Sequence, residues 1–117
     1  VVFVGQVGDR DRVAGFYRLA YLYMCMSEHE GFCIPLLEAM TQRVPIIAYR
    51  STGVVDNLGE AGVLVDDKDP VALAEMARLL CDNPAYRERV IASQLLQAER
   101  WHPSKALAAL HGWLRTL

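Results

Sequence analysis

The sequence predicts an α/β fold built on a parallel sheet with flanking helices. Short, continuously apolar runs of strand length occur at residues 1–4, 21–26, 44–48 and 63–65. Uninterrupted apolar runs are typical of strands that are buried on both faces of a parallel sheet. Segments with apolar residues at helical spacing separate or follow these runs, and this order indicates a sheet covered by helices.

Each predicted helix has a start signal. Asp9 or Asp11 can cap the first helix, whose apolar stripe includes Phe16 and Tyr17. In the C-terminal half, a polar residue directly before a proline marks three further starts, at Asp69-Pro70, Asn83-Pro84 and His102-Pro103. The last helix carries an apolar stripe of Leu107, Leu110, Leu114 and Leu117, and we interpret Trp101 and Trp113 as packing anchors.

Composition narrows the class of protein. A chain of 117 residues makes about one domain, and a net charge of −2 excludes the basic footprint of a nucleic-acid partner. Three cysteines without C-x-x-C spacing indicate a reducing compartment, so we expect a cytoplasmic protein, at most attached to the inner face of the membrane. The chain opens directly on an apolar strand-like run, which we interpret as part of a longer protein.

The junction at residues 27–40 is the candidate functional site. A predicted strand ends there, a tight loop with Glu30 and Gly31 follows, and a helix begins with Pro35 in its first turn and Glu38 one turn inside it. Ligands of open parallel sheets bind beyond the carboxyl ends of the strands, where a helix N-terminus offers unpaired N–H groups. The alternative is that both acids only compensate the helix dipole.

This junction resembles a known signature. The run 30–40, EGFCIPLLEAM, is similar to the E-x7-E motif of retaining glycosyltransferases with the GT-B fold, the glycogen-synthase and sucrose-synthase-like enzymes. The resemblance extends over nearly all of the 117 residues. It implies that residues 1–117 are part of the C-terminal, Rossmann-like, nucleotide-sugar-binding domain of a two-domain enzyme.

The resemblance also implies roles for individual residues. Glu30, taken as the catalytic residue, contacts the hydroxyls of the donor sugar, and the backbone of Gly31, Phe32, Cys33 and Ile34 contacts the sugar and diphosphate. Glu38 accepts hydrogen bonds from the ribose, and the loop at Val7 lies near the base. The donor is a UDP- or GDP-type nucleotide sugar, the acceptor is a carbohydrate or glycolipid, and the enzyme's own N-terminal domain completes the cleft. Transfer retains the anomeric configuration by front-face attack, with no cofactor and no protein nucleophile. Because the acceptor side belongs to the N-terminal domain, the chain alone is expected to be inactive.

Some residues depart from the family pattern. Cys33 and Arg43 stand where glycine is usual, and Asp56 replaces a glutamate. Either Arg43 adopts a left-handed conformation, which costs about 1 kcal/mol, or the helix ends in another way. Cys33 has no evident base partner and is not expected to be a nucleophile. Glu28, His29, Glu30 and Cys33 are ligand-type residues but do not complete H-E-x-x-H, so no metal site is expected.

The family's six-stranded order, 3-2-1-4-5-6, raises a question about the sheet. The chain begins at the third strand, so two strands that would separate residues 1–4 from residues 21–26 are missing. We therefore expect an incomplete piece of a sheet or a strand-exchanged dimer. Two other functions remain open: a non-catalytic interaction module that keeps the fold, and a sugar-nucleotide epimerase, although epimerases have a serine- and glycine-rich loop at this junction.

Overall fold

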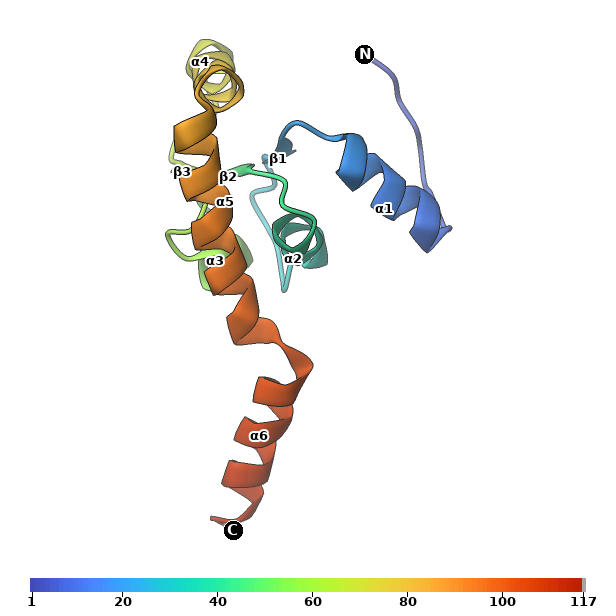
Figure 1. Ribbon diagram of the computed structural model, residues 1–117, viewed down its shortest axis with the longest axis vertical. Coiled ribbons are helices and arrows are strands. Elements are labelled where there is room, and N and C mark those ends of the chain that lie inside the picture. The colour runs from blue at the N-terminus through green and yellow to red at the C-terminus, as the bar shows by residue number, and fades with distance from the viewer. Residues whose placement is uncertain (117) are drawn as a thin grey trace.

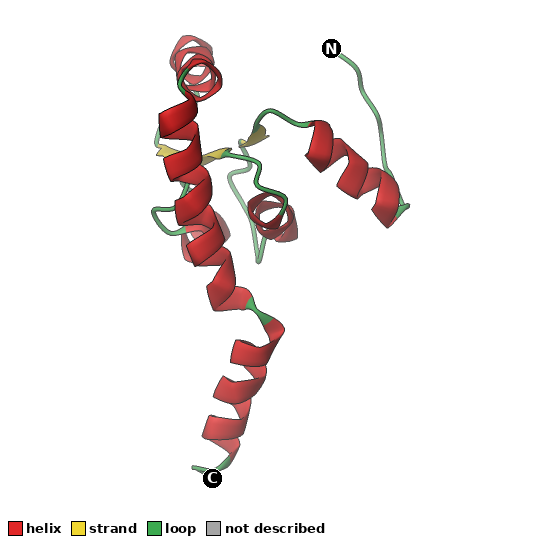
Figure 2. Ribbon diagram, in the orientation of Figure 1, coloured by secondary structure: helices red, strands yellow, loops and turns green. Residues whose placement is uncertain are grey.

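Three short parallel strands form one sheet in the computed structural model, which describes residues 1–116 (Figures 1 and 2). The strands are β1 (Tyr23–Cys25), β2 (Ile46–Tyr49) and β3 (Val63–Val65), in the order β1-β2-β3. Met24 pairs with Ile47, and Ile47 pairs with Val63 on the other side, so β2 is the central strand. The predicted α/β fold with a parallel sheet and flanking helices is confirmed.

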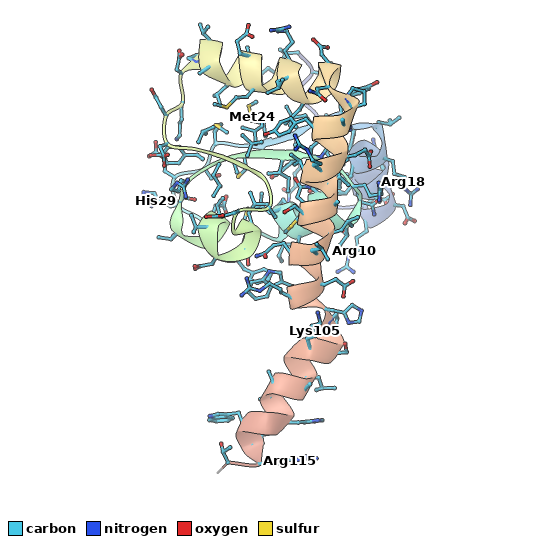
Figure 3. All side chains as sticks on the ribbon, turned by 60° about the vertical axis from the view of Figure 1, so that its left-hand side comes forward. Arg10, Arg18, Met24, His29, Lys105 and Arg115 are labelled. Carbon is cyan, nitrogen blue, oxygen red and sulfur yellow. The ribbon has the colours of Figure 1, made fainter. Side chains whose placement is uncertain are left out.

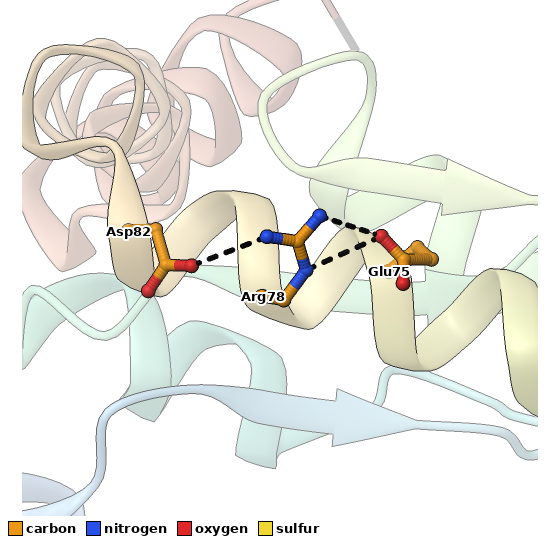
Figure 4. A network of polar contacts seen from close by, with 3 residues as sticks. All are labelled: Glu75, Arg78 and Asp82. Carbon is orange, nitrogen blue, oxygen red and sulfur yellow. Dashed lines mark hydrogen bonds and ion pairs between the residues drawn. The ribbon is translucent and has the colours of Figure 1, made fainter.

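The described part of the chain also contains six α-helices and one 3₁₀ turn. They are α1 (Arg10–Leu19), α2 (Ile34–Thr41), α3 (Thr52–Leu58), α4 (Pro70–Asp82), α5 (Pro84–Ala98), η1 (Glu99–Trp101) and α6 (Pro103–Leu114). The predicted caps form: Asp9, Asp69 and Asn83 each accept hydrogen bonds from backbone N–H groups two or three residues ahead. On the exposed side of α4, Arg78 pairs with Glu75 and Asp82 (Figure 4).

The sheet is covered on both faces, as the continuous apolar strands predict. One cluster packs Ile46 and Ala48 against α2 and α3, and the other packs Ile47 and Val65 against α4 and α5. Successive residues of β2 point to opposite faces, which is why Ile46 and Ile47 belong to different clusters.

Helix α5 links the two clusters beside the beginning of β2. The fully buried side chain of Gln94 accepts a hydrogen bond from the Ile46 N–H (2.9 Å) and donates one to the Val44 carbonyl (2.8 Å). Its amide group therefore satisfies two buried backbone groups where no neighbouring strand reaches them.

The strand prediction for residues 1–4 is wrong. These residues form no strand, and Phe3 is 94% exposed. An apolar run becomes a strand only where a neighbouring strand takes up its N–H and C=O groups, and this run has no such partner in the sheet. Because β1, β2 and β3 are contiguous, the sheet has no internal gap; strand exchange between copies stays a prediction.

The polar run Ser51 to Gly53 has the composition of a loop, but Ser51 is the N-cap of helix α3, and Thr52 and Gly53 lie in its first turn. The last helix, α6, leads away from the rest of the molecule (Figure 1). Its leucines are therefore about half exposed, and the packing role predicted for Trp113 is wrong, since its side chain is 58% exposed. Leu117 lies outside the described residues.

Candidate functional site

The loops that follow the three strands meet at the carboxyl edge of the sheet. Lys68, after β3, donates to the carboxylate of Glu28, after β1, at 2.7 Å, and its ammonium lies 4.4 Å from the ring centroid of Tyr49. Arg50, after β2, pairs with Asp66 at 2.7 Å. His29 is exposed in the same group of loops (Figure 3). Charged side chains therefore gather at the edge of the sheet where ligands of open parallel sheets bind.

The turn between β1 and α2 has the predicted strand–loop–helix form. Cys33 is the N-cap of α2 and takes a left-handed conformation (φ 48°, ψ 62°), and Pro35 lies in the first turn. Gly31, Phe32 and Ile34 are exposed, whereas the Cys33 side chain is buried. Gly31, Phe32 and Ile34 thus lie at the surface of the protein, beside the positive end of the helix dipole.

A cavity of about 410 Å³ lies between α1 and α2 and contains Glu38. Val7 and Ile34 line it as well, so three of the predicted site residues share one cavity. Arg10 adds a cation to the lining, which sequence reasoning missed, because nothing local distinguishes a site arginine from a solvated one at the start of a helix. The cavity is lined mainly by apolar surface and contains one acid, Glu38, and one base, Arg10.

Tyr17 holds the Glu38 carboxylate in place. Its hydroxyl donates a hydrogen bond to Glu38 Oε2 at 3.1 Å, from α1 across to α2. Burial, followed by the nearby negative charge of Glu38, raises the pKa of Tyr17, so the phenol remains a donor throughout the physiological pH range. Sequence analysis placed Tyr17 only in an apolar stripe.

Glu30 does not line the cavity that contains Glu38. It is partly buried and lies beside the thiols of Cys25 and Cys33, with one ligand-type atom of each of the three residues within 4.8 Å of the others. The structure therefore brings Glu30 together with the two cysteines, not with Glu38. Two other ligand-type residues of this stretch are not part of the group: Glu28 pairs with Lys68, and His29 is exposed.

The Cys33 thiol is not prepared for nucleophilic attack. Burial, with further contributions from Cys25 and Glu30, raises the pKa of this thiol to about 12. Because the thiolate is the nucleophilic form, this environment supports the expectation that Cys33 is no nucleophile.

The first residues of α3 pack against the turn between β1 and α2. A Cβ atom at Gly53 would lie 1.6 Å from the Gly31 carbonyl oxygen, and Thr52 Oγ1 donates to the Glu30 carbonyl at 3.4 Å. Phe32 is fixed from another side, where its ring meets Trp101 edge-on with centroids 5.0 Å apart. A polar run such as Ser51 to Gly53 after a strand is typical of a loop at the carboxyl edge of a sheet, but nothing in the sequence indicates the close approach of Gly53 to Gly31.

Comparison with known proteins assigns the chain to a family. The family described as Glycosyl transferases group 1 matches residues 1–94. The chain belongs to the group 1 glycosyl transferases. The C-terminal domain of a glycosyl transferase group 1 family protein (LpcC) from Francisella tularensis superposes with a TM-score of 0.70 and 26% identity, covering 83% of this chain and 51% of that one. The fold is therefore that of a GT-B C-terminal domain.

Curated relatives agree with this assignment. The O-antigen chain mannosyltransferase B of Escherichia coli is 30% identical over 99 residues, which are 85% of this chain and 26% of the relative. The D-inositol 3-phosphate glycosyltransferase of Acidothermus cellulolyticus is 31% identical over 107 residues, 90% of this chain and 24% of the relative. The chain thus spans about a quarter of the length of these relatives. In the described residues, no helix is both long and apolar enough to cross a membrane.

Proposed function

We propose that this chain is the donor-binding part of a retaining glycosyltransferase of the E-x7-E class, which transfers a sugar from a UDP- or GDP-type nucleotide sugar to a carbohydrate or glycolipid acceptor. The observation that carries the proposal is the cavity between α1 and α2, where Glu38 and the Val7 loop lie beside the first turn of α2. A longer, two-domain enzyme supplies the acceptor side of the cleft, in the cytoplasm or at the inner face of the membrane. The names of the relatives favour this function over an interaction module or an epimerase.

In the proposed complex, Glu38 accepts hydrogen bonds from both ribose hydroxyls. A carboxylate has enough acceptor sites for two adjacent donors. The hydrogen bond from Tyr17 takes one site on Oε2 and fixes the side chain, and the other lone pairs remain for the ribose. The neighbouring Val7 loop covers the base, at the same cavity.

In the proposed complex, the diphosphate binds at the turn of Gly31, Phe32, Cys33 and Ile34. Backbone N–H groups at the start of α2 stabilise the charge that develops on the departing phosphate without a metal ion. Glu30 holds hydroxyls of the donor sugar, and the leaving phosphate accepts the proton of the attacking acceptor hydroxyl on the same face. The anomeric configuration is therefore retained, and no cofactor takes part.

A binding experiment on the full-length enzyme tests the role of Glu38. Glu38→Gln should weaken nucleoside diphosphate binding by about tenfold or more, because a charge-assisted hydrogen bond contributes roughly 1.5–3 kcal/mol. The wild type should bind a 2′-deoxynucleoside diphosphate more weakly than the ribonucleotide. Glu38→Gln should bind these two nucleotides with equal affinity. Glu75→Gln, an acid-to-amide change on the exposed face of α4, is the matched control. Equal affinities of wild type and Glu38→Gln for both nucleotides would refute the ribose role.

A kinetic experiment tests Glu30 separately. Glu30→Gln should lower the rate of sugar transfer and leave nucleoside diphosphate affinity unchanged, since the nucleotide alone has no sugar for Glu30 to hold. The anomeric configuration of the product, read by NMR, tests retention. An inverted product would overturn the front-face mechanism whatever the effect of Glu30.

A further inference from the structure

Two buried thiols and one carboxylate meet beneath the turn between β1 and α2. Cys25 is the last residue of β1, Cys33 is the N-cap of α2, and Glu30 lies in the loop between them. The strand therefore positions one thiol and the helix positions the other. The two Sγ atoms and a carboxylate oxygen all lie within 4.8 Å of one another. Neither thiol is in a disulfide, and both are at most 7% exposed.

We propose that Cys25, Cys33 and Glu30 form a binding site for one thiophilic divalent cation, with Zn²⁺ as the best fit. Zn–S bonds of about 2.3 Å at tetrahedral angles place two sulfur atoms about 3.8 Å apart, so the present groups need to approach by no more than about 1 Å. Three protein ligands leave the fourth position to water. Mg²⁺ and Ca²⁺ are excluded, because these ions prefer oxygen ligands alone.

The surroundings favour a cation. Both cysteines belong to an apolar cluster with Leu36 and Val54. In such low-dielectric surroundings, the attraction between a cation and negatively charged ligands is stronger than in water. The ion pairs of the described residues leave Glu30 out, so no lysine or arginine there neutralises its carboxylate. Glu30 is only partly buried and provides the solvent-facing side of the site, through which an ion can enter.

Binding of the cation releases two protons from the protein. The cation replaces one proton on each thiol, both protons go to solvent, and the carboxylate binds in its ionised form. The resulting site carries one net negative charge, shared among two thiolates, one carboxylate and the ion. The left-handed Cys33 and the preceding turn would be held more rigidly to the end of β1.

The site itself does not depend on the proposed function, but one consequence does. If Glu30 holds the donor sugar, a cation bound to the Glu30 carboxylate makes that carboxylate unavailable to the sugar. Zn²⁺ should then compete with the nucleotide sugar for binding to the full-length enzyme. The expected result is that Zn²⁺ weakens binding of the nucleotide sugar and leaves binding of the nucleoside diphosphate unchanged. Cation binding without any competition would overturn the sugar role of Glu30 and leave the cation site standing.

Cd²⁺ titration of the full chain tests the site directly. With the chain reduced by a phosphine and freed of metal by a chelator, Cd²⁺ should produce a thiolate-to-metal charge-transfer band that saturates at one ion per chain, and Zn²⁺ should displace it. Cys25→Ser and Cys33→Ser should each lower the Cd²⁺ affinity by at least about tenfold and reduce the intensity of the band. Glu30→Gln should lower the affinity but keep the intensity, since both sulfur ligands remain.

Two further variants protect the test from misfolding. Cys33→Gly removes the thiol at a left-handed position that glycine adopts without strain, so this variant should fold and still lose the band. Cys81→Ser removes the exposed thiol of α4 and should behave as wild type. No band in the wild type, an unchanged band in Cys33→Gly, or loss of the band in Cys81→Ser would each overturn the proposal.

Discussion

The contact between Gly53 and the turn at Gly31 gives the sharpest test of how the site is supported. Gly53 lies in the first turn of α3, and Gly53→Ala places its new Cβ 1.6 Å from the Gly31 carbonyl oxygen and 2.6 Å from that of Glu30. Ordinary contacts of a Cβ begin at 3.4 Å, so the turn must retreat by about 1.8 Å, the difference between the two distances. The obstacle is backbone, which has no rotamer to change.

Two opposing effects decide the magnitude. Overpacking of this kind costs typically about 1–3 kcal/mol, and contact with backbone belongs at the upper end. Alanine is favoured over glycine within a helix by at most about 1 kcal/mol. We therefore expect Gly53→Ala to lower the free energy of unfolding by about 2 kcal/mol. Because the displaced residues carry the amides proposed to bind diphosphate, nucleoside diphosphate affinity of the full-length enzyme should fall as well.

Gly15→Ala is the matched control. It makes the same change in α1, where a Cβ meets nothing within 4 Å. This control should stabilise the chain by roughly 0.4–1 kcal/mol, since only the propensity effect remains. Urea unfolding followed by circular dichroism measures both variants. If Gly53→Ala proved as stable as Gly15→Ala and bound nucleotide like the wild type, the turn would not depend on this contact and the reasoning would be wrong.

Three more outcomes are expected. Arg43→Gly should stabilise the chain by up to about 1 kcal/mol in urea unfolding, because Arg43 has a left-handed conformation (φ 60°) that glycine adopts without strain. The ion pair with Glu88 that is lost is exposed and contributes little, and no gain over Arg43→Ala would contradict this prediction. Gln94→Leu should destabilise by about 2–5 kcal/mol, since it leaves two buried backbone groups without partners, and a loss below that of an exposed Gln→Leu change would count against it. Tyr17→Phe should weaken nucleoside diphosphate binding several-fold in calorimetry by freeing Glu38, with no further loss in a Glu38→Gln background.

Features that depend on a few neighbouring residues could be predicted from the sequence. The caps at Asp9, Asp69 and Asn83 form because a side-chain oxygen reaches N–H groups within three residues. Likewise, Arg43 adopts one of the two expected alternatives: its N–H bonds the Met40 carbonyl, and the Val44 N–H bonds that of Ala39. This Schellman ending uses only backbone within five residues.

Features that need a distant partner could not be predicted. Residues 1–4 have the composition of a strand, but composition does not supply a neighbouring strand, and they remain exposed. The cavity around Glu38 depends on where α1 settles against α2, which no local signal specifies. The closeness of Cys25, Cys33 and Glu30 is a different case: they are near in sequence, but their spacing matches no ligand motif, and only the path of the turn brings them together.

The sequence by itself determined the alternation of strands and helices, the ends of most helices and the acidic junction with its glycosyltransferase signature. Only the tertiary structure decided that Glu38 shares a cavity with Val7 and Tyr17, while Glu30 lies with two thiols. The physical reason is that caps and periodicity depend on residues within one or two turns of chain, whereas the two groups depend on how α1 packs against α2 and on the path of the turn between β1 and α2.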